Sequence, residues 1–109
     1  MNKTRRNELK DIQEEIKSIM EDADALKEKV EELKDKIEAV RDEEESAYDN
    51  LPESLQESER GERMQSAMDS MDNAGSDLDD VINSIDSCVS EMEDSLDNAV
   101  DNLQEAIDA

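Results

Sequence analysis

The feature that most constrains the fold is a heptad repeat, in which apolar residues recur at alternating steps of three and four. In the first half of the chain these residues are Leu9, Ile12, Ile16, Ile19, Ala23, Leu26, Val30, Leu33, Ile37 and Val40. In the second half they are Met64, Met68, Met71, Gly75, Leu78, Ile82, Ile85, Val89, Met92, Leu96, Ala99, Leu103 and Ala106. This spacing puts the apolar side chains on one face of a helix. The sequence therefore predicts an all-α fold with two long helices, over residues 5–48 and 62–108.

The two repeats are separated by a connector at residues 49–61. Pro52 disfavours helical geometry at Leu51 and suits the start of a new helix. Ser54 and Glu57 have the spacing of a capping box. We expect a break at 49–52 and then a short helical turn that leads into the second long helix. Residues 1–109 are thus predicted to form a single helical-hairpin domain.

Charged residues beside the apolar positions predict how the two helices pair. With Leu9 at heptad position a and Ile12 at d, the first helix carries Lys27, Lys34 and Arg41 at e, and the second carries Asp86, Asp79 and Asp72 at e. In an antiparallel coiled coil the e positions of the two helices face each other, and one register forms all three pairs. The same register sets large core residues against small ones, such as Val40 against Gly75. We therefore expect a long antiparallel hairpin with a and d residues at the seam.

A further apolar column on the second helix lies at the g positions. Its members are Ala67, Ala74, Val81 and Cys88. An apolar stripe wider than a and d suits a bundle better than a two-stranded coil. We expect the hairpin to form a homodimer, a four-helix bundle, with Ala74, Val81 and Cys88 at the interface. Cys88 is interpreted as a small buried residue there, although an intermolecular disulfide or a sensor thiol is the alternative.

The residue content argues against catalysis. The chain has no His and a single Cys, so the usual catalytic dyads and transition-metal sites cannot be assembled from it. General acid–base chemistry needs a pocket that shifts one carboxyl pKa, which a solvated helix face does not supply. We predict a protein that is not an enzyme, with no catalytic residue, no cofactor and no metal site.

The charge distribution is the strongest functional signal. The net charge is −22, and all 12 Lys and Arg residues lie in the first 63 positions. From Met64 onward there are 13 acidic residues and no basic one. The expected partner-binding face consists of Asp80, Asp94, Asp97, Asp101, Glu105 and Asp108. One interpretation is a solubilising face. The other is a surface that imitates DNA, because a dimer would carry one charge per ~1.6 Å, close to the ~1.7 Å of duplex DNA.

The centre of the chain adds a resemblance. Residues 48–61, with the sequence YDNLPESLQESERG, and the N-terminal residues 3–9 resemble a group of small acidic helical proteins encoded by phages and mobile elements of Gram-positive bacteria. The resemblance implies a setting, the cytoplasm of a bacterial host, and it implies no activity. Because neither a signal peptide nor a membrane-spanning segment is recognised, the cytoplasm is also the natural location.

These observations lead to two hypotheses about function. The first is an acidic binding protein, a DNA mimic or anti-defence inhibitor, that occupies a basic surface of a host nucleic-acid-binding or defence protein. The second is a structural or scaffold hairpin whose acidity serves solubility. Direct binding to nucleic acid is not expected, since the phosphate backbone would repel this charge.

Overall fold

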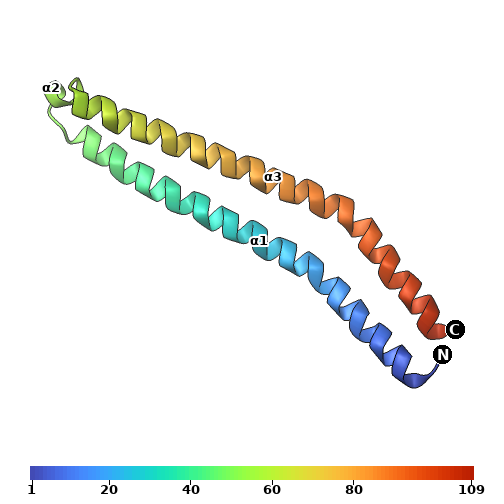
Figure 1. The fold of residues 1–109 in the computed structure, drawn as a ribbon. Coiled ribbons are helices and arrows are strands. Elements are labelled where there is room, and N and C mark those ends of the chain that lie inside the picture. Colours follow the sequence, from blue (N-terminus) through green and yellow to red (C-terminus); the bar gives the residue numbers. More distant parts are fainter. The chain divides into compact units, whose positions relative to one another are not determined.

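The computed structural model describes residues 1–109, which form three helices and no strand. The helices are α1 (Lys3–Asp49), α2 (Glu53–Gln56) and α3 (Glu59–Asp108) (Figure 1). The chain divides into two compact units. The first consists of Met1–Glu28 and Asn83–Ala109, and the second of Lys29–Ile82. Within each unit a segment of α1 lies beside a segment of α3. The prediction of an all-α fold with two long helices is confirmed.

The long helices begin earlier than the sequence predicts. The side chain of Asn2 caps α1, because its Oδ1 accepts a hydrogen bond of 2.8 Å from the backbone N–H of Arg5. α1 therefore starts at Lys3 rather than at residue 5. α3 starts at Glu59 rather than at residue 62, since Gly61 is part of the helix. No helix is both long and apolar enough to cross a membrane.

The connector in the second unit contains the expected break and the expected short helix. Pro52 stands immediately before α2, and its carbonyl oxygen accepts hydrogen bonds from the backbone N–H groups of Leu55 and Gln56, at 2.8 and 3.1 Å. No side chain caps this helix. The prediction of a capping box formed by Ser54 and Glu57 is therefore wrong, because Pro52 occupies the cap position and Ser54 already lies inside the helix.

Gly61 is required by a close approach between the connector and α3. The side-chain amide of Gln56 donates a hydrogen bond of 3.0 Å to the carbonyl oxygen of Tyr48, which ties the connector to the end of α1. A Cβ atom at Gly61 would lie 2.0 Å from the backbone oxygen of Gln56. Any larger residue at position 61 would therefore collide with the backbone of α2.

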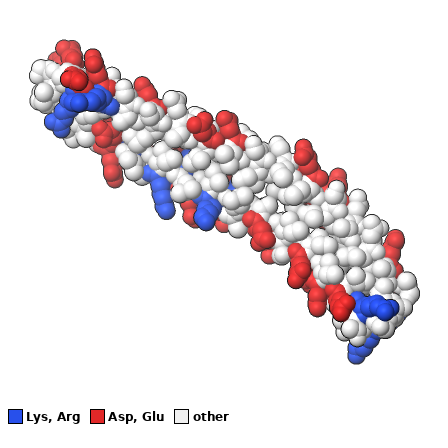
Figure 2. Space-filling view, in the orientation of Figure 1, with Lys and Arg blue, Asp and Glu red and all other residues white.

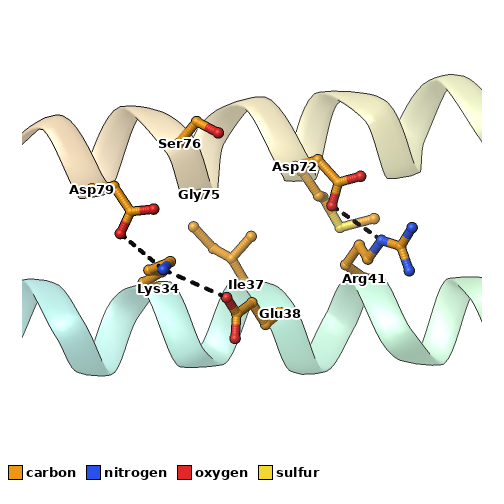
Figure 3. Close-up of a pocket in the computed structure, with 9 residues that line it drawn as sticks. Lys34, Ile37, Glu38, Arg41, Asp72, Gly75, Ser76 and Asp79 are labelled. Atoms are coloured by element: carbon orange, nitrogen blue, oxygen red, sulfur yellow. Dashed lines mark hydrogen bonds and ion pairs between the residues drawn. The ribbon is translucent and has the colours of Figure 1, made fainter.

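Three ion pairs show the register of α1 and α3. In the second unit Lys34 Nζ lies 2.8 Å from Asp79 Oδ1, and Arg41 Nε lies 3.1 Å from Asp72 Oδ1 (Figure 3). In the first unit the matching distance, between Lys27 Nζ and Asp86 Oδ1, is 2.8 Å. Residue numbers rise along one helix as they fall along the other. The antiparallel register predicted from the e positions is confirmed in both units.

These pairs also affect the basic groups. The hydrogen bond with Asp79 raises the pKa of Lys34 above its ordinary value, and the nearby charges of Asp79 and Glu38 raise it further against some desolvation. Desolvation lowers the pKa of Arg41, but attraction to Asp72 and Glu45 outweighs it, so the net shift is upward. Both bases are therefore held in their charged form.

The d positions of α1 lie at an open edge of the seam and are only partly covered by α3. The side chains of this column are between 39% and 54% exposed; they are Ile12, Ile19, Leu26, Leu33 and Val40. The e column is covered instead. Gln13 in this column is buried, and Met20, Lys27, Lys34, Arg41 and Tyr48 are half-buried. The prediction that a and d residues of the first helix share the seam therefore fails for d in part, because α3 covers the a and e side more closely and leaves the d side chains about half exposed.

The space around Gly75 shows the consequence of this rotation. Ile37 extends from α1 toward α3 near Gly75, between the Lys34 and Arg41 ion pairs (Figure 3). A Cβ atom at Gly75 would still have no neighbour within 4 Å, and a cavity of about 250 Å³ remains there. Val40 does not line this cavity and is 54% exposed. The prediction that Val40 packs against Gly75 is therefore wrong.

Candidate protein-binding surface

The carboxylates of the expected partner-binding face stand on the outer side of α3. Five of them, spaced by three or four residues along the helix in the first unit, are Asp94, Asp97, Asp101, Glu105 and Asp108. We refer to these five residues as the acidic face. All five are exposed. Residues three or four apart are neighbours on a helix surface, so the structure brings these carboxylates onto one side. Asp80, the sixth predicted residue, is exposed on α3 in the second unit.

The acidic face is not neutralised by the chain itself. Asp94, Asp97, Asp101 and Glu105 form no ion pair, and Asp108 accepts a single hydrogen bond of 3.1 Å from the side chain of Gln104. α3 has no Lys or Arg beyond Arg63. The negative charges therefore face solvent, where a basic partner could reach them.

Arg6 of α1 reaches the end of α3, but it binds backbone oxygens there. Its Nε donates a hydrogen bond of 3.1 Å to the carbonyl oxygen of Ile107, and its Nη2 donates one of 3.5 Å to that of Ala109. These carbonyls lie at the C-terminus of α3, where a positive charge is favoured by the helix dipole. Arg6 thus serves the helix end and leaves the carboxylates of the acidic face without a counter-charge.

The carboxylates are spread out rather than clustered. Figure 2 shows acidic side chains distributed along both long helices with uncharged surface between them. No group of three or more acidic residues is close enough to hold one metal ion. The arrangement suits many separate contacts with Lys and Arg side chains over an extended surface, as opposed to a single chelating site.

The residues predicted at a dimer interface differ in exposure. In the second unit Ala74 is half-buried and Val81 is 42% exposed. In the first unit Cys88 is exposed and has no disulfide partner. One chain therefore leaves Val81 and Cys88 uncovered, and their burial between two copies stays a prediction.

Comparison of the chain with protein-family profiles, with curated proteins and with solved structures finds no match. The likeness of residues 48–61 to phage-encoded acidic proteins therefore stays a prediction.

Two structural features were missed by the sequence analysis. Gln13 is buried, and its Nε2 donates hydrogen bonds to the carbonyl oxygen of Val100 at 3.0 Å and to Gln104 Oε1 at 3.3 Å. The other is the exposed d column of α1. The sequence contained one signal for both features. Gln13 stands at an e position, seven residues from Met20 and fourteen from Lys27. The whole e column, and not its three bases alone, indicated the side of α1 that α3 covers.

Proposed function

We propose that this chain is a non-enzymatic acidic binding protein that occupies a basic, nucleic-acid-binding surface on a host or defence protein of a bacterium. The observation that carries the proposal is the acidic face, because all five of its carboxylates are exposed and none has an ion pair within the chain. A purely solubilising surface needs net charge, but it does not need one long helix segment free of bases.

The spacing of the carboxylates is compatible with imitation of a phosphate strand. Successive members of the acidic face are three or four residues apart. At a rise of 1.5 Å per residue they are separated by about 5 Å along the axis. One strand of duplex DNA carries a charge every ~3.4 Å. A basic groove that binds phosphates could therefore accept α3 with most of its Lys and Arg side chains paired.

The proposed setting and assembly extend this hypothesis. The resemblance of residues 48–61 supports a phage or mobile element as the source, with the partner in the cytoplasm of the bacterial host. We also propose that two copies associate into a four-helix bundle. Exposed apolar side chains on both long helices, such as Leu26 and Val81, support this association because a soluble monomer rarely leaves such columns uncovered.

The alternative is a structural or scaffold hairpin whose acidity serves solubility. The exposed d column of α1 favours it, since an uncovered apolar stripe is typical of a helix that binds other helices. Under this alternative the apolar columns would carry the function, and the acidic face would be replaceable.

The proposal is tested by capture of partners from a bacterial lysate, followed by competition with duplex DNA and measurement of affinity with the purified partner. The decisive variant replaces four carboxylates of the acidic face by amides: Asp94→Asn, Asp97→Asn, Asp101→Asn and Asp108→Asn. A matched control makes the same change in net charge on α1 in the same unit, at exposed residues without ion pairs: Asp11→Asn, Glu21→Gln, Asp24→Asn and Glu28→Gln.

The expected partner is a nucleic-acid-binding protein that duplex DNA releases. Its affinity should fall steeply between ~50 and ~300 mM salt, because the attraction between opposite charges is screened. The acidic-face variant should bind at least about tenfold more weakly, and the α1 control should bind nearly as well as the wild type. Equal losses in both variants would show that net charge alone matters. Unchanged affinity in the acidic-face variant would refute this surface as the binding site.

A further inference from the structure

The exposed d column of α1 is the largest apolar feature that the fold leaves uncovered. In the first unit it consists of Ile12, Ile19 and Leu26, and in the second of Leu33 and Val40. In the second unit it borders a groove of about 500 Å³, lined by Leu33, Lys36, Ile37, Val40, Met71 and Leu78. Burying half-exposed Ile, Leu and Val side chains away from water is favourable. This column is therefore expected to bind another apolar surface.

The charges along one border of the column indicate what that occupant is. The g positions of α1 lie directly beside d on the side away from the seam. In the first unit these positions are acidic, with Glu8, Glu15 and Asp22, and in the second unit they begin with the bases Lys29 and Lys36. All five side chains are exposed, and none forms an ion pair within the chain.

We propose that the occupant is a second copy of this chain, whose α1 runs antiparallel to the first. The first-unit stretch of one copy, apolar with an acidic border, then covers the second-unit stretch of the other, apolar with a basic border. The two-fold symmetry of such a pair repeats the contact in the opposite direction, so both copies use the same surface. The inference rests on the proposed association of two copies and is independent of the acidic face.

One register satisfies the apolar and the charged positions together. Ile12 meets the partner's Val40, and Ile19 meets the partner's Leu33. Leu26 meets the partner's Leu26 on the two-fold axis, so every member of the d column is paired.

In the same register the bordering charges are opposite. Glu15 faces the partner's Lys36, and Asp22 faces the partner's Lys29, which gives four ion pairs in the symmetric dimer. Only Glu8 and the partner's Glu43 are alike, at the two ends of the contact. A parallel arrangement would place the two g columns on opposite sides of the seam and would form none of these pairs.

The neighbouring surface of α3 fits the same assembly. In the second unit Ala74 and Val81 follow Met71 and Leu78 by three residues, so they lie next to the apolar groove and away from the side of Asp79. A second copy seated on the groove would extend toward the interface residues that the sequence predicts. The dimer would then be a four-helix bundle rather than a pair of single helices.

Cysteine cross-linking tests the proposed geometry. Each variant carries Cys88→Ser so that a single new thiol remains. Leu26→Cys should form a disulfide-linked dimer under mild oxidation, because this position meets itself on the two-fold axis. Ile12→Cys alone should not, but a mixture of Ile12→Cys and Val40→Cys should. A parallel pair would instead link every variant to itself, and that result would overturn the proposal.

A charge exchange tests the ionic border. Lys29→Glu with Lys36→Glu in one variant, or Glu15→Lys with Asp22→Lys in another, should each raise the dimer dissociation constant about tenfold or more. An equimolar mixture of the two variants should form a heterodimer, since all four facing pairs are again opposite. The control is Lys10→Glu with Lys17→Glu, which makes the same change in net charge at exposed positions outside the border. Sedimentation equilibrium measures the masses, and circular dichroism verifies that every variant is helical.

The outcomes separate this inference from the proposed function. A chain that sediments as a monomer up to ~0.5 mM would overturn the dimer and leave partner binding by the acidic face intact. A dimer that forms without the Leu26→Cys cross-link would overturn the α1 contact alone. Loss of partner binding in the Asp→Asn variant, with dimerisation unchanged, is expected because the two surfaces are distinct.

Discussion

The e and d columns of α1 differ in exposure to solvent, and the difference is the opposite of what their residue types would suggest. The e column contains Gln13, Lys27, Lys34 and Arg41, yet it is covered by α3. The d column contains only Ile, Leu and Val, yet its side chains stay between 39% and 54% exposed. The a column lies between them and contacts α3 in either arrangement. Apolar periodicity thus defines a stripe along α1, whereas polar contacts with α3 decide whether the d or the e column beside it is covered.

The energies make this outcome reasonable. An exposed ion pair contributes little by itself. However, the two possible packings of α3, over the d side or over the e side of α1, share the contacts of the a column. A small difference in free energy between them is therefore enough to favour one. On the e side α1 gains ion pairs in both units, such as Lys34 with Asp79, and a buried hydrogen bond from Gln13 to the backbone of α3. On the d side α1 would gain only apolar contacts with α3, and in the proposed dimer a second copy provides apolar contacts to this side.

The largest effect is expected at Gly61, where α3 lies against the connector that ties back to the covered side of α1 at Tyr48. A Cβ atom there would lie 2.0 Å from the backbone oxygen of Gln56, whose side chain holds the carbonyl of Tyr48. Gly61→Ala should therefore displace α2 and lower the free energy of unfolding by about 2 kcal/mol or more, despite the better helix propensity of Ala. Urea denaturation followed by circular dichroism measures this change.

Gly75→Ala is the matched control for this substitution. It makes the same chemical change inside the same helix, but its Cβ atom would meet nothing within 4 Å. Helix propensity should then dominate, and the free energy of unfolding should rise by about 1 kcal/mol. Destabilisation by Gly75→Ala would show that α3 lies closer to Ile37 than the structure places it, and would weaken the contrast between the two sides of α1.

The next effect distinguishes the columns of α1 directly. Ile37 extends toward α3 near Gly75, whereas Leu33, four residues earlier at d, is 46% exposed. In a dilute sample in which the chain is monomeric, Ile37→Ala should lower the free energy of unfolding by about 2 kcal/mol and Leu33→Ala by less than about 1 kcal/mol. At concentrations that favour the proposed dimer, the cost of Leu33→Ala should grow. Equal costs in the dilute sample would contradict the exposure of the d column.

The smallest effect concerns the ion pairs of the covered side. Lys34→Glu should lower the melting temperature by no more than about 5 °C, because it sets two carboxylates against each other. Adding Asp79→Lys should restore most of the loss, since the pair is then reversed. Thermal denaturation of the wild type, both single variants and the double variant measures the coupling. Two single effects that simply add would mean that this pair does not set the register.

Alkaline pH provides a control for the same pair. The hydrogen bond with Asp79 raises the pKa of Lys34 in the folded chain, so its contribution to stability is complete below the unfolded pKa of about 10.4. That contribution is lost as the pH rises through the folded value. Lys34→Arg keeps its charge as the pH rises, so its free energy of unfolding should exceed that of the wild type increasingly above about pH 10.4. A constant difference would argue against an ionic role for Lys34.

Much of the candidate surface could be predicted because it depends on one helix at a time. The exposure of Asp94 and Asp101 follows from their spacing on α3, and the pairing of Lys34 with Asp79 follows from charge and heptad position. The roles of Gln13 and Gly61 could not be predicted. Gln13 contacts a backbone carbonyl that is 87 residues away, and Gly61 is constrained by the path of the connector. Neither partner has a sequence signature.

The sequence by itself determined two long helices, their antiparallel register and the run of carboxylates without bases, because periodicity and charge order survive any rotation of the helices about their axes. Only the tertiary structure decided that rotation. It placed the e column of α1 against α3 and left Leu26 and Leu33 of the d column uncovered. The physical reason is that the a column has the d column on one side and the e column on the other, and α3 can cover either side. Specific contacts such as those of Gln13 and Lys34 were needed to choose between them.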